Sequence, residues 1–482
     1  MKIIEMKKYF IVIIIFFVSL GSNAQTESEI MTVTGDSLVG KFIDGESVRE
    51  VYGNVVLRQG NVRITCNKAI QFLGRNDAEL IGNVIATQDT LTIKTEKGFY
   101  YGNQRMSRST SGVMLDDKKV ILNADSGQYY FDEDRAFFQS NVTLYDTTTT
   151  LTSDELTYFK KRDYSIATGR VKIVDAENII QADSLEHFRN TEITFANKNV
   201  KITNIKNNTS IFGGHLEDYR KRKYTLIQIQ PVLMQIDSSI TLDEDSVEVV
   251  TLDTLLINSI TMESFRDTAD IFIATDSVKI IRGEFASDND KTIYIRSEEK
   301  IITSKLNQDA RQPVLWYETS QLTGDSIIIH LEDNNIKILE VENNAFLLSQ
   351  NENYRQRFDQ SSGGRVMIYF DENKISRSEF YGTVYSIYNL FEEEEPNGLT
   401  KSNSHSAVVY FEDNQVSEVR LYGQPVSEYY PEPQVMGNER SFLLPRFIHF
   451  DNRPVKEELL KSIKAFDNIT KEKIENVDNT TQ

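Results

Sequence analysis

The chain has 482 residues, of which 39% are hydrophobic and 26% are charged, and its formal net charge is −19 at pH 7. The hydrophobic content is too high for a disordered chain, and the negative charge disfavours binding to nucleic acid or to an anionic membrane surface. Cys66 is the sole cysteine, which excludes an intrachain disulfide, and we expect it to be a small buried hydrophobe in the first repeat.

The first 24 residues predict a secretory signal peptide. A positively charged start, an apolar run over residues 9–20 and small residues at 22–24 are typical of such a segment. The apolar run is short for a membrane helix, and no later segment is apolar enough to predict one. We therefore expect a mature chain that starts near Gln25 and lies outside the cytoplasm.

A repeat of 29 residues follows in six copies, from Gly53 to about Gln230. The residues that open the copies are spaced 29 apart, at Gly53, Gly82, Ser111, Ser140, Gly169 and Lys198. Apolar side chains recur in the same register two, four and eleven positions later. Apolar residues at a spacing of two predict strands, and a unit of this length must fold back on itself. We therefore expect two antiparallel strands per unit, with the units stacked to cover each other's apolar faces.

These recurring positions form one apolar stripe along the predicted stack. The stripe contains Val55, Leu57, Ile64, Val84, Ala86, Ile93, Val113, Leu115, Leu122, Val142, Leu144, Leu151, Val171, Ile173, Ile180, Val200 and Ile202. One interpretation is a dry core, because alternating Val, Leu and Ile fill the interior of any β stack. The other is a groove for acyl chains, because small members such as Ala86 leave room among the large ones. Periodicity by itself favours the dry core.

The repeats predict a first region over residues 25–240, and residues 241–453 predict a second, related β stack with longer units. Three segments there have an acidic or Asn-rich centre between strand residues, which is typical of tight hairpin turns: residues 331–336, 370–375 and 411–416. We expect enlarged loops around residues 361–364 and 392–398.

Residues 454–482 predict a terminal helix and tail. Val455, Leu459, Ile463, Phe466 and Ile469 recur at helical spacing. A helix in this position most often covers the open end of a stack, where it prevents edge-to-edge aggregation. Docking of a partner protein is the alternative.

The sequence indicates neither catalysis nor a metal site nor a cofactor. The five His lack the spacing of zinc ligands, and nucleophile and phosphate-loop motifs are absent. Asp125, Asp154 and Asp183 recur at the repeat period, as calcium ligands or the paired acids of a glycosidase would. The calcium signature is absent, and the acids belong to every unit instead of one site, so we expect ladder hydrogen bonds or turns.

The repeated phrases resemble the OstA/LptA family over at least residues 53–230. Its strand-opening motif is similar to Gly53-Asn54-Val55, Gly82-Asn83-Val84 and Gly169-Arg170-Val171, and its downstream motif to Ala124-Asp125-Ser126, Ser153-Asp154-Glu155 and Ala182-Asp183-Ser184. The resemblance implies an all-β fold, an elongated open β-jellyroll or "β-taco". Stacked antiparallel strands built from the 29-residue repeats would form it, with a short C-terminal helix.

The resemblance also implies a function without catalysis. It implies a periplasmic lipopolysaccharide-binding transport or bridge protein that holds acyl chains in an apolar groove between the inner and outer membranes. The implied partners are lipopolysaccharide itself through its lipid A acyl chains, other Lpt-type β-jellyroll proteins joined edge to edge, an inner-membrane exporter complex and an outer-membrane translocon. The seventeen residues of the stripe would then face lipid. Association with the outer membrane stays open, and the alternative is a structural or adhesive β-solenoid with a filled core and no lipid ligand.

Overall fold

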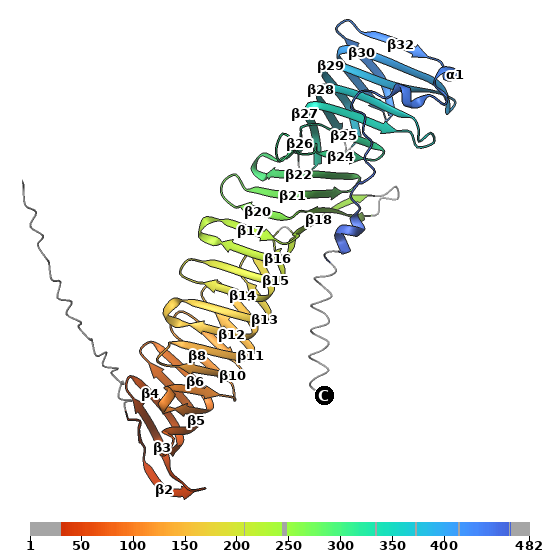
Figure 1. Ribbon diagram of the computed structural model, residues 1–482. Coiled ribbons are helices and arrows are strands. Elements are labelled where there is room, and N and C mark those ends of the chain that lie inside the picture. The colour runs from red at the N-terminus through yellow and green to blue at the C-terminus, as the bar shows by residue number, and fades with distance from the viewer. Residues whose placement is uncertain are drawn as a thin grey trace, which may run out of the picture.

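The structure, a computed structural model, describes residues 30–463 apart from 207, 243–247, 333–334, 372–373, 413–414 and 462. The predicted signal peptide and the end of the predicted C-terminal tail lie outside the described residues. The described strands form one 32-stranded antiparallel sheet. It winds into an elongated, twisted stack with the N-terminal strands at one end and the C-terminal strands at the other (Figure 1).

The first part of the stack contains the strands that carry the 29-residue repeats, and short 3-10 turns join several of them. These elements are β1 (Thr32–Thr34), β2 (Ser37–Ile43), β3 (Glu46–Gln59), β4 (Val62–Phe72), β5 (Asp77–Gln88), β6 (Leu91–Tyr101), η1 (Gly102–Gln104), β7 (Met106–Ser109), β8 (Val113–Asp116), β9 (Ile121–Ala124), β10 (Ser126–Tyr130), β11 (Arg135–Tyr145), β12 (Thr150–Phe159), η2 (Lys160–Arg162), β13 (Tyr164–Val174), β14 (Asn178–Phe188), β15 (Ile193–Asn204), β16 (Thr209–Tyr219), η3 (Arg220–Arg222) and β17 (Tyr224–Gln228).

The second part continues the same sheet to the C-terminal end of the stack. Its elements are β18 (Val232–Leu242), β19 (Glu248–Asn258), β20 (Thr261–Phe265), β21 (Ile271–Arg282), β22 (Phe285–Ile295), η4 (Arg296–Glu298), β23 (Lys300–Ser304), β24 (Val314–Tyr317), β25 (Ser320–Thr323), β26 (Ser326–Glu332), β27 (Asn335–Gln350), β28 (Phe358–Asp371), β29 (Lys374–Glu392), β30 (Glu395–Glu412), β31 (Gln415–Tyr422), β32 (Val426–Tyr430), α1 (Glu432–Val435) and η5 (Glu439–Phe442). A last helix begins at Lys456 and is described as far as Ile463.

One 29-residue unit corresponds to one pair of antiparallel strands. β11, β13 and β15 begin at Arg135, Tyr164 and Ile193, and each pairs with the strand that follows it. In the third unit the two strands are divided into the four short strands β7 to β10. Hydrogen bonds then join each unit to the next, for example between β4 and β5, so the ladder is continuous along the stack.

Each long strand turns a corner at the position that opens the repeat. Gly53 and Asn54 have φ values of 70° and 43°, and Gly169 and Arg170 have φ values of 73° and 45°. The pairing register shifts at the same place, as between Tyr52 and Val55. Two successive left-handed residues form a bulge that bends the strand, and Gly and Asn adopt this conformation most readily. The corner divides every strand between two walls that face each other.

The recurring aspartates lie at these corners. Asn141 Nδ2 donates a hydrogen bond to Asp125 Oδ2 over 2.7 Å, and Asn199 Nδ2 donates one to Asp183 Oδ2 over 2.9 Å. Each carboxylate therefore ties one corner to the next unit. The prediction of ladder hydrogen bonds at turns is confirmed for these residues.

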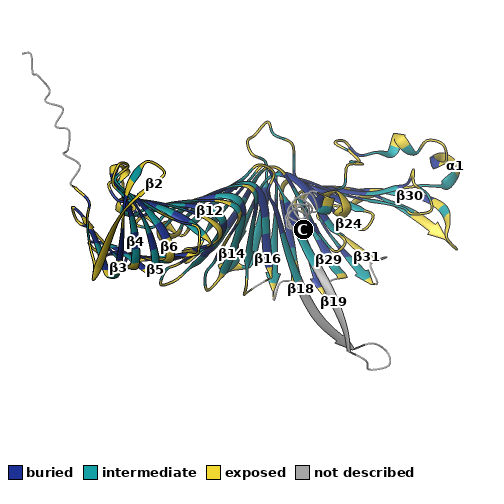
Figure 2. Cartoon of the chain, turned by 90° about the horizontal axis from the view of Figure 1, so that it is seen from below, coloured by how far each residue is buried: buried dark blue, intermediate teal, exposed yellow. Residues whose placement is uncertain are grey.

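Apolar side chains from both walls point into the space between them. One cluster of buried residues extends from Met31 to Val278, and a second from Leu315 to Val409. Buried positions follow the strands through the interior, whereas exposed positions gather at the turns (Figure 2). The sheet and the first cluster both continue past residue 240, where the sequence predicts the end of the first region.

The chain then turns back along the stack from its C-terminal end (Figure 1). Gln321 Nε2 donates to the Ile448 carbonyl over 2.8 Å, and Arg453 donates to the Glu284 carbonyl over 2.7 Å. Leu459 and Ile463 of the last helix belong to a buried cluster with Phe212, Val232, Leu256, Ile281, Ala286, Val314 and Trp316. The predicted helix is present from Lys456, but it covers the middle of the stack instead of an open end, because strands there have apolar side chains on their outer face.

Candidate functional site

The seventeen residues of the predicted stripe all lie between the two walls in the first part of the stack. Fifteen of them are buried in one cluster, and Ile180 and Ile202 are partly buried and pack against it. The alternation of side chains along each strand puts them on the same face, as the period of two predicts. The structure therefore brings the whole stripe together.

The interior around this stripe is filled by the protein's own side chains. Leu57, Leu115 and Leu122 are fully buried, and so is the large ring of Tyr129. The cavity beside Ala86 has a volume of only about 20 Å³, which is room for about one water molecule. The space that a small residue leaves is taken by neighbouring rings, and this part of the structure has the packing of a dry core.

The walls of the first part also meet along the side opposite the corners, which we call the seam. Tyr100 Oη donates to Gln59 Oε1 over 2.7 Å, and Tyr158 Oη donates to Asp117 Oδ2 over 2.6 Å. Burial raises the pKa of Tyr100 to about 12. Burial and the Asp117 carboxylate raise the pKa of Tyr158, so both phenols stay protonated and donate.

Ion pairs between the walls extend the seam. They are Lys119–Asp163 at 2.7 Å, Arg189–Asp146 at 3.2 Å and Arg220–Asp175 at 3.4 Å. Most of these cations are at least partly exposed, so each pair contributes little stability, roughly 0 to 1 kcal/mol. Closure of the first part therefore depends mainly on the packed interior.

The walls separate in the second part of the stack. A cavity of about 600 Å³ lies between them there, and a neighbouring cavity of about 340 Å³ shares Phe285, Leu315 and Tyr317 with it. Ligand pockets in proteins have volumes of roughly 300–1,000 Å³. The strands are also longer, with 19 residues in β29 and 18 in β30 against 11 in β11 and 10 in β12. Both cavities are of ligand size, unlike the cavity of about 20 Å³ beside Ala86 in the first part.

Apolar side chains line a large part of both cavities. The larger one is lined by Phe285, Leu315, Leu322, Leu339, Leu347, Ile368, Phe370, Ile375, Phe380, Val409, Phe411 and Val416, and the smaller one by Leu255, Ile280, Tyr294, Ile301, Ile329, Leu331 and Ile336 among others. The smaller cavity lies at the junction of the two buried clusters, since Leu255 and Ile280 pack against the first cluster and Phe285 and Ile329 against the second. The cavities therefore continue the apolar interior of the first part.

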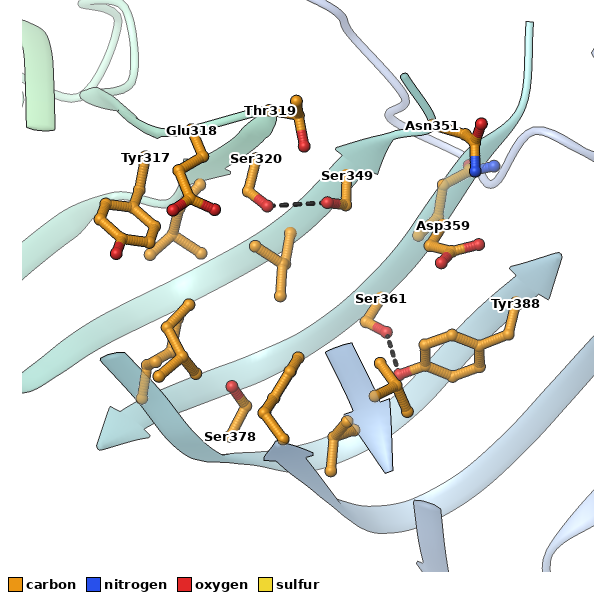
Figure 3. A pocket seen from close by; sticks show the side chains of 18 of the residues that line it. Tyr317, Glu318, Thr319, Ser320, Ser349, Asn351, Asp359, Ser361, Ser378 and Tyr388 are labelled. Carbon is orange, nitrogen blue, oxygen red and sulfur yellow. Dashed lines mark hydrogen bonds between the residues drawn. The ribbon is translucent and has the colours of Figure 1, made fainter. Parts of the chain in front are cut away.

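A group of polar side chains occupies one side of the larger cavity (Figure 3). Ser361 Oγ and Tyr388 Oη are 3.0 Å apart, and Ser320 Oγ and Ser349 Oγ are 2.7 Å apart. Small serines leave room between the walls where the first part has large apolar residues. Burial raises the pKa of Tyr388 to about 12, so its hydroxyl stays protonated.

Asp359 belongs to the same side of the cavity. Its Oδ1 accepts hydrogen bonds from the backbone N and the Nδ2 of Asn389, both over 2.8 Å. Burial raises the pKa of the Asp359 carboxyl, and the two hydrogen bonds from Asn389 oppose that shift. The side chain is thus held in a fixed orientation at the cavity wall.

Sequence reasoning missed this cavity. The expected enlarged loop at residues 361–364 is wrong, because these residues lie inside β28, where they form part of the wall and the next corner. The expected loop at 392–398 is a tight turn between β29 and β30. The signal that was available is the presence of serines on neighbouring long strands, such as Ser349 in β27, Ser361 in β28 and Ser378 in β29.

No cluster of three or more His, Cys, Asp or Glu that could hold a metal ion occurs among the described residues. Cys66 is buried in the first cluster, as predicted, and burial raises the pKa of its thiol. Within residues 30–463, as far as they are described, none of the helices is long and apolar enough to cross a membrane.

Both ends of the stack have unpaired strand edges. Among the described strands, β2 pairs only with β3, and β32 pairs only with β30. Phe42 in β2 is 74% exposed and Tyr429 in β32 is 55% exposed. An exposed edge with apolar side chains is a template for pairing with another strand.

Comparisons with known proteins give one match to a family over part of the chain and one similar solved structure. Residues 27–183 match the family described as OstA-like protein. The crystal structure of LptH from Pseudomonas aeruginosa, titled the LptA homologous periplasmic component of the conserved lipopolysaccharide transport device, is similar to this chain at 16% sequence identity. The similarity covers 30% of this chain and 95% of that chain, with a TM-score of 0.17. No curated protein matches the chain.

Proposed function

We propose that the chain, whose residues 27–183 match the family described as OstA-like protein, is a periplasmic lipopolysaccharide-transport protein without catalytic activity. It would hold the acyl chains of lipopolysaccharide in its apolar interior while the lipid passes between the inner and outer membranes. The predicted signal peptide supports this location.

The two neighbouring cavities of the second part carry the proposal. Leu, Ile and Phe side chains line a large part of both cavities, and the smaller cavity adjoins the apolar interior of the first part. The apolar walls of a cavity are exposed to water when it is empty of ligand. An apolar ligand that covers them is favoured by roughly 25 cal/mol for each Å² of apolar surface removed from water. Acyl chains of a lipid fit this chemistry.

In this structure, the first part of the stack favours the alternative function, that of a structural β-solenoid without a lipid ligand. Its interior is filled, as expected for a structural β-solenoid. We retain the seventeen residues as the proposed extension of the lipid path, which requires the walls to separate along the seam. Acyl chains would then replace the contacts that Leu57, Leu115 and Leu144 now make across the interior.

The open edges support the proposed partners. Strand β2 would pair with a related β-jellyroll protein at the N-terminal end, and β31 and β32 would pair with another at the C-terminal end. An inner-membrane exporter complex and an outer-membrane translocon would then lie beyond the two ends. Main-chain hydrogen bonds give such edge pairing its affinity.

Native mass spectrometry of the full chain purified from the periplasm, followed by lipid extraction, tests the proposal. Co-purified lipid A that is lost in Leu347→Trp supports it, because the indole fills the cavity without adding charge. Tyr385→Trp is the matched control, because Tyr385 lies on the outer face of β29 and is 45% exposed. A folded wild-type protein that carries no lipid and takes up no added lipopolysaccharide contradicts the proposal and leaves the β-solenoid.

Photo-crosslinking separates the two parts of the proposed path. A benzophenone side chain introduced at position 347 should crosslink to lipopolysaccharide in cells. The same group at position 115 should crosslink only if the first part opens. Crosslinks at 347 and none at 115 would restrict the lipid site to the second part and remove the seventeen residues from it.

A further inference from the structure

The larger cavity has an unusual balance of charge for a site that meets an anionic lipid. Its lining residues include the acids Glu318, Asp359 and Glu394, and no Lys, Arg or His is among them. Glu318 and Glu394 are exposed, so they lie where a ligand's polar end would approach. A phosphate group placed here would be repelled by these carboxylates and would find no cation among the residues that line the cavity.

The polar groups of the cavity nevertheless have free hydrogen-bonding capacity. Ser378 is 1% exposed, and its buried Oγ has no hydrogen-bond partner among the described residues. Asp359 Oδ2 has no partner among the described residues, since both bonds from Asn389 end on Oδ1. Ser361 and Tyr388 bond to each other and retain one further donor and free lone pairs.

These groups are the ones that bind hydroxyls. A hydroxyl donates one hydrogen bond and accepts two, so it can donate to Asp359 and accept from Tyr388 or Ser361. A buried polar atom that lacks a partner is stabilised when a ligand atom satisfies it.

We propose that the larger cavity binds an amphiphile whose polar group is uncharged and rich in hydroxyls, with those hydroxyls at Asp359, Ser361 and Tyr388 and the acyl chain along Leu339, Leu347 and Ile368. This inference rests on the proposed function and specifies its substrate class at this site. Any phosphate on the transported lipid then lies outside the cavity, beyond the acidic residues Glu318 and Glu394.

Three probes with the same alkyl chain test this selectivity on the full mature chain. Isothermal titration calorimetry, below the micelle concentration of each probe, compares n-dodecyl β-D-glucoside, n-dodecyl phosphate and dodecyltrimethylammonium. We expect the glucoside to bind at least about tenfold more tightly than the phosphate, since like charges repel strongly where water is excluded. Phosphate or ammonium binding as tight as glucoside binding would overturn the inference and leave the lipid-transport proposal standing. Failure of all three probes to bind would overturn both.

Variants locate the site. Tyr388→Phe should weaken glucoside binding about three- to tenfold, the range for one lost hydrogen bond, and should leave phosphate binding unchanged. Tyr385→Phe on the outer face of the same strand is the matched control and should change neither affinity. The double variant Glu318→Lys with Glu394→Lys should strengthen binding of the phosphate probe, so that the difference in affinity between the glucoside and the phosphate becomes smaller. Equal losses for glucoside and phosphate in Tyr388→Phe would overturn the inference.

Discussion

The side chain of Asp154 occupies the space that a side chain on Gly169 would need. A Cβ atom placed on Gly169 would lie 2.4 Å from Asp154 Oδ2, and the φ of Gly169 is +73°. Asp154 also forms an ion pair with Arg170, with 2.5 Å between Nη2 and Oδ1. Gly53 has the same relation to Asp36 at an earlier corner. At each of these corners, a glycine in the left-handed conformation lies against the side chain of an aspartate from earlier in the chain. At the Gly169 corner, that aspartate also forms an ion pair with the next residue, Arg170.

We expect Gly169→Ala to lower the free energy of unfolding by about 1–3 kcal/mol, because the new Cβ is strained at this φ and displaces Asp154. The midpoint of urea unfolding, followed by circular dichroism, measures the change. Gly40→Ala is the control, since a Cβ there meets nothing within 4 Å and its φ is not left-handed. Equal midpoints for the two variants would show that the corner does not require glycine.

Two Leu→Ala variants should distinguish the filled interior from the cavity. Leu115 is fully buried, whereas Leu347 is partly buried and lines the larger cavity. Leu115→Ala creates a new cavity and should cost about 2–5 kcal/mol, while Leu347→Ala enlarges an existing space and should cost clearly less. Denaturant unfolding of both variants checks this. A larger loss for Leu347→Ala would mean that the walls of the second part are packed together in solution.

Docking of the last helix should be visible in the fluorescence of Trp316, the single tryptophan of the chain. Leu459 and Trp316 are 4% and 5% exposed and belong to the same buried cluster. Leu459→Asp should release the helix, because burial of an unpaired carboxylate is unfavourable, and the emission of Trp316 should shift to the red. Lys456→Asp, on the exposed side of the helix, is the control and should leave the emission unchanged.

Stability should depend on pH through Asp359. Burial raises the pKa of this carboxyl in the folded protein above its ordinary value of 3.8, so the folded state binds the proton more tightly than the unfolded state. The stability that comes from the protonated form is therefore complete below that value and is lost as pH rises through the folded pKa.

We expect the stability of Asp359→Asn, relative to that of the wild type, to be higher at about pH 7 than at about pH 3.5. Asparagine does not ionise, and its carbonyl oxygen can still accept a hydrogen bond from Asn389. Thermal unfolding at both pH values measures this difference. Asp309→Asn, at an exposed turn, should show no such dependence. A difference between Asp359→Asn and wild type that does not change with pH would place the carboxyl in contact with water.

Much of the fold could be predicted because the information is local. The spacing of Val55 and Leu57 determines which side chains point inward, and the Gly53-Asn54 pair determines where the strand bends. The recurring aspartates could be assigned to turns for the same reason. These features depend on the backbone geometry of a few consecutive residues, and the repeat multiplies the signal six times.

The sequence by itself determined the all-β repeat, the inward face of each strand and the helical pattern after Pro454. Only the tertiary structure decided where the interior is filled and where it is open, because that depends on side chains brought together from both walls, such as Ala86 with Tyr129 or Leu347 with Phe380. It also decided that Leu459 belongs to one buried cluster with Val232 and Trp316, which lie more than a hundred residues earlier in the chain. Strand periodicity specifies a face, but the distance between two faces is a property of the assembled stack.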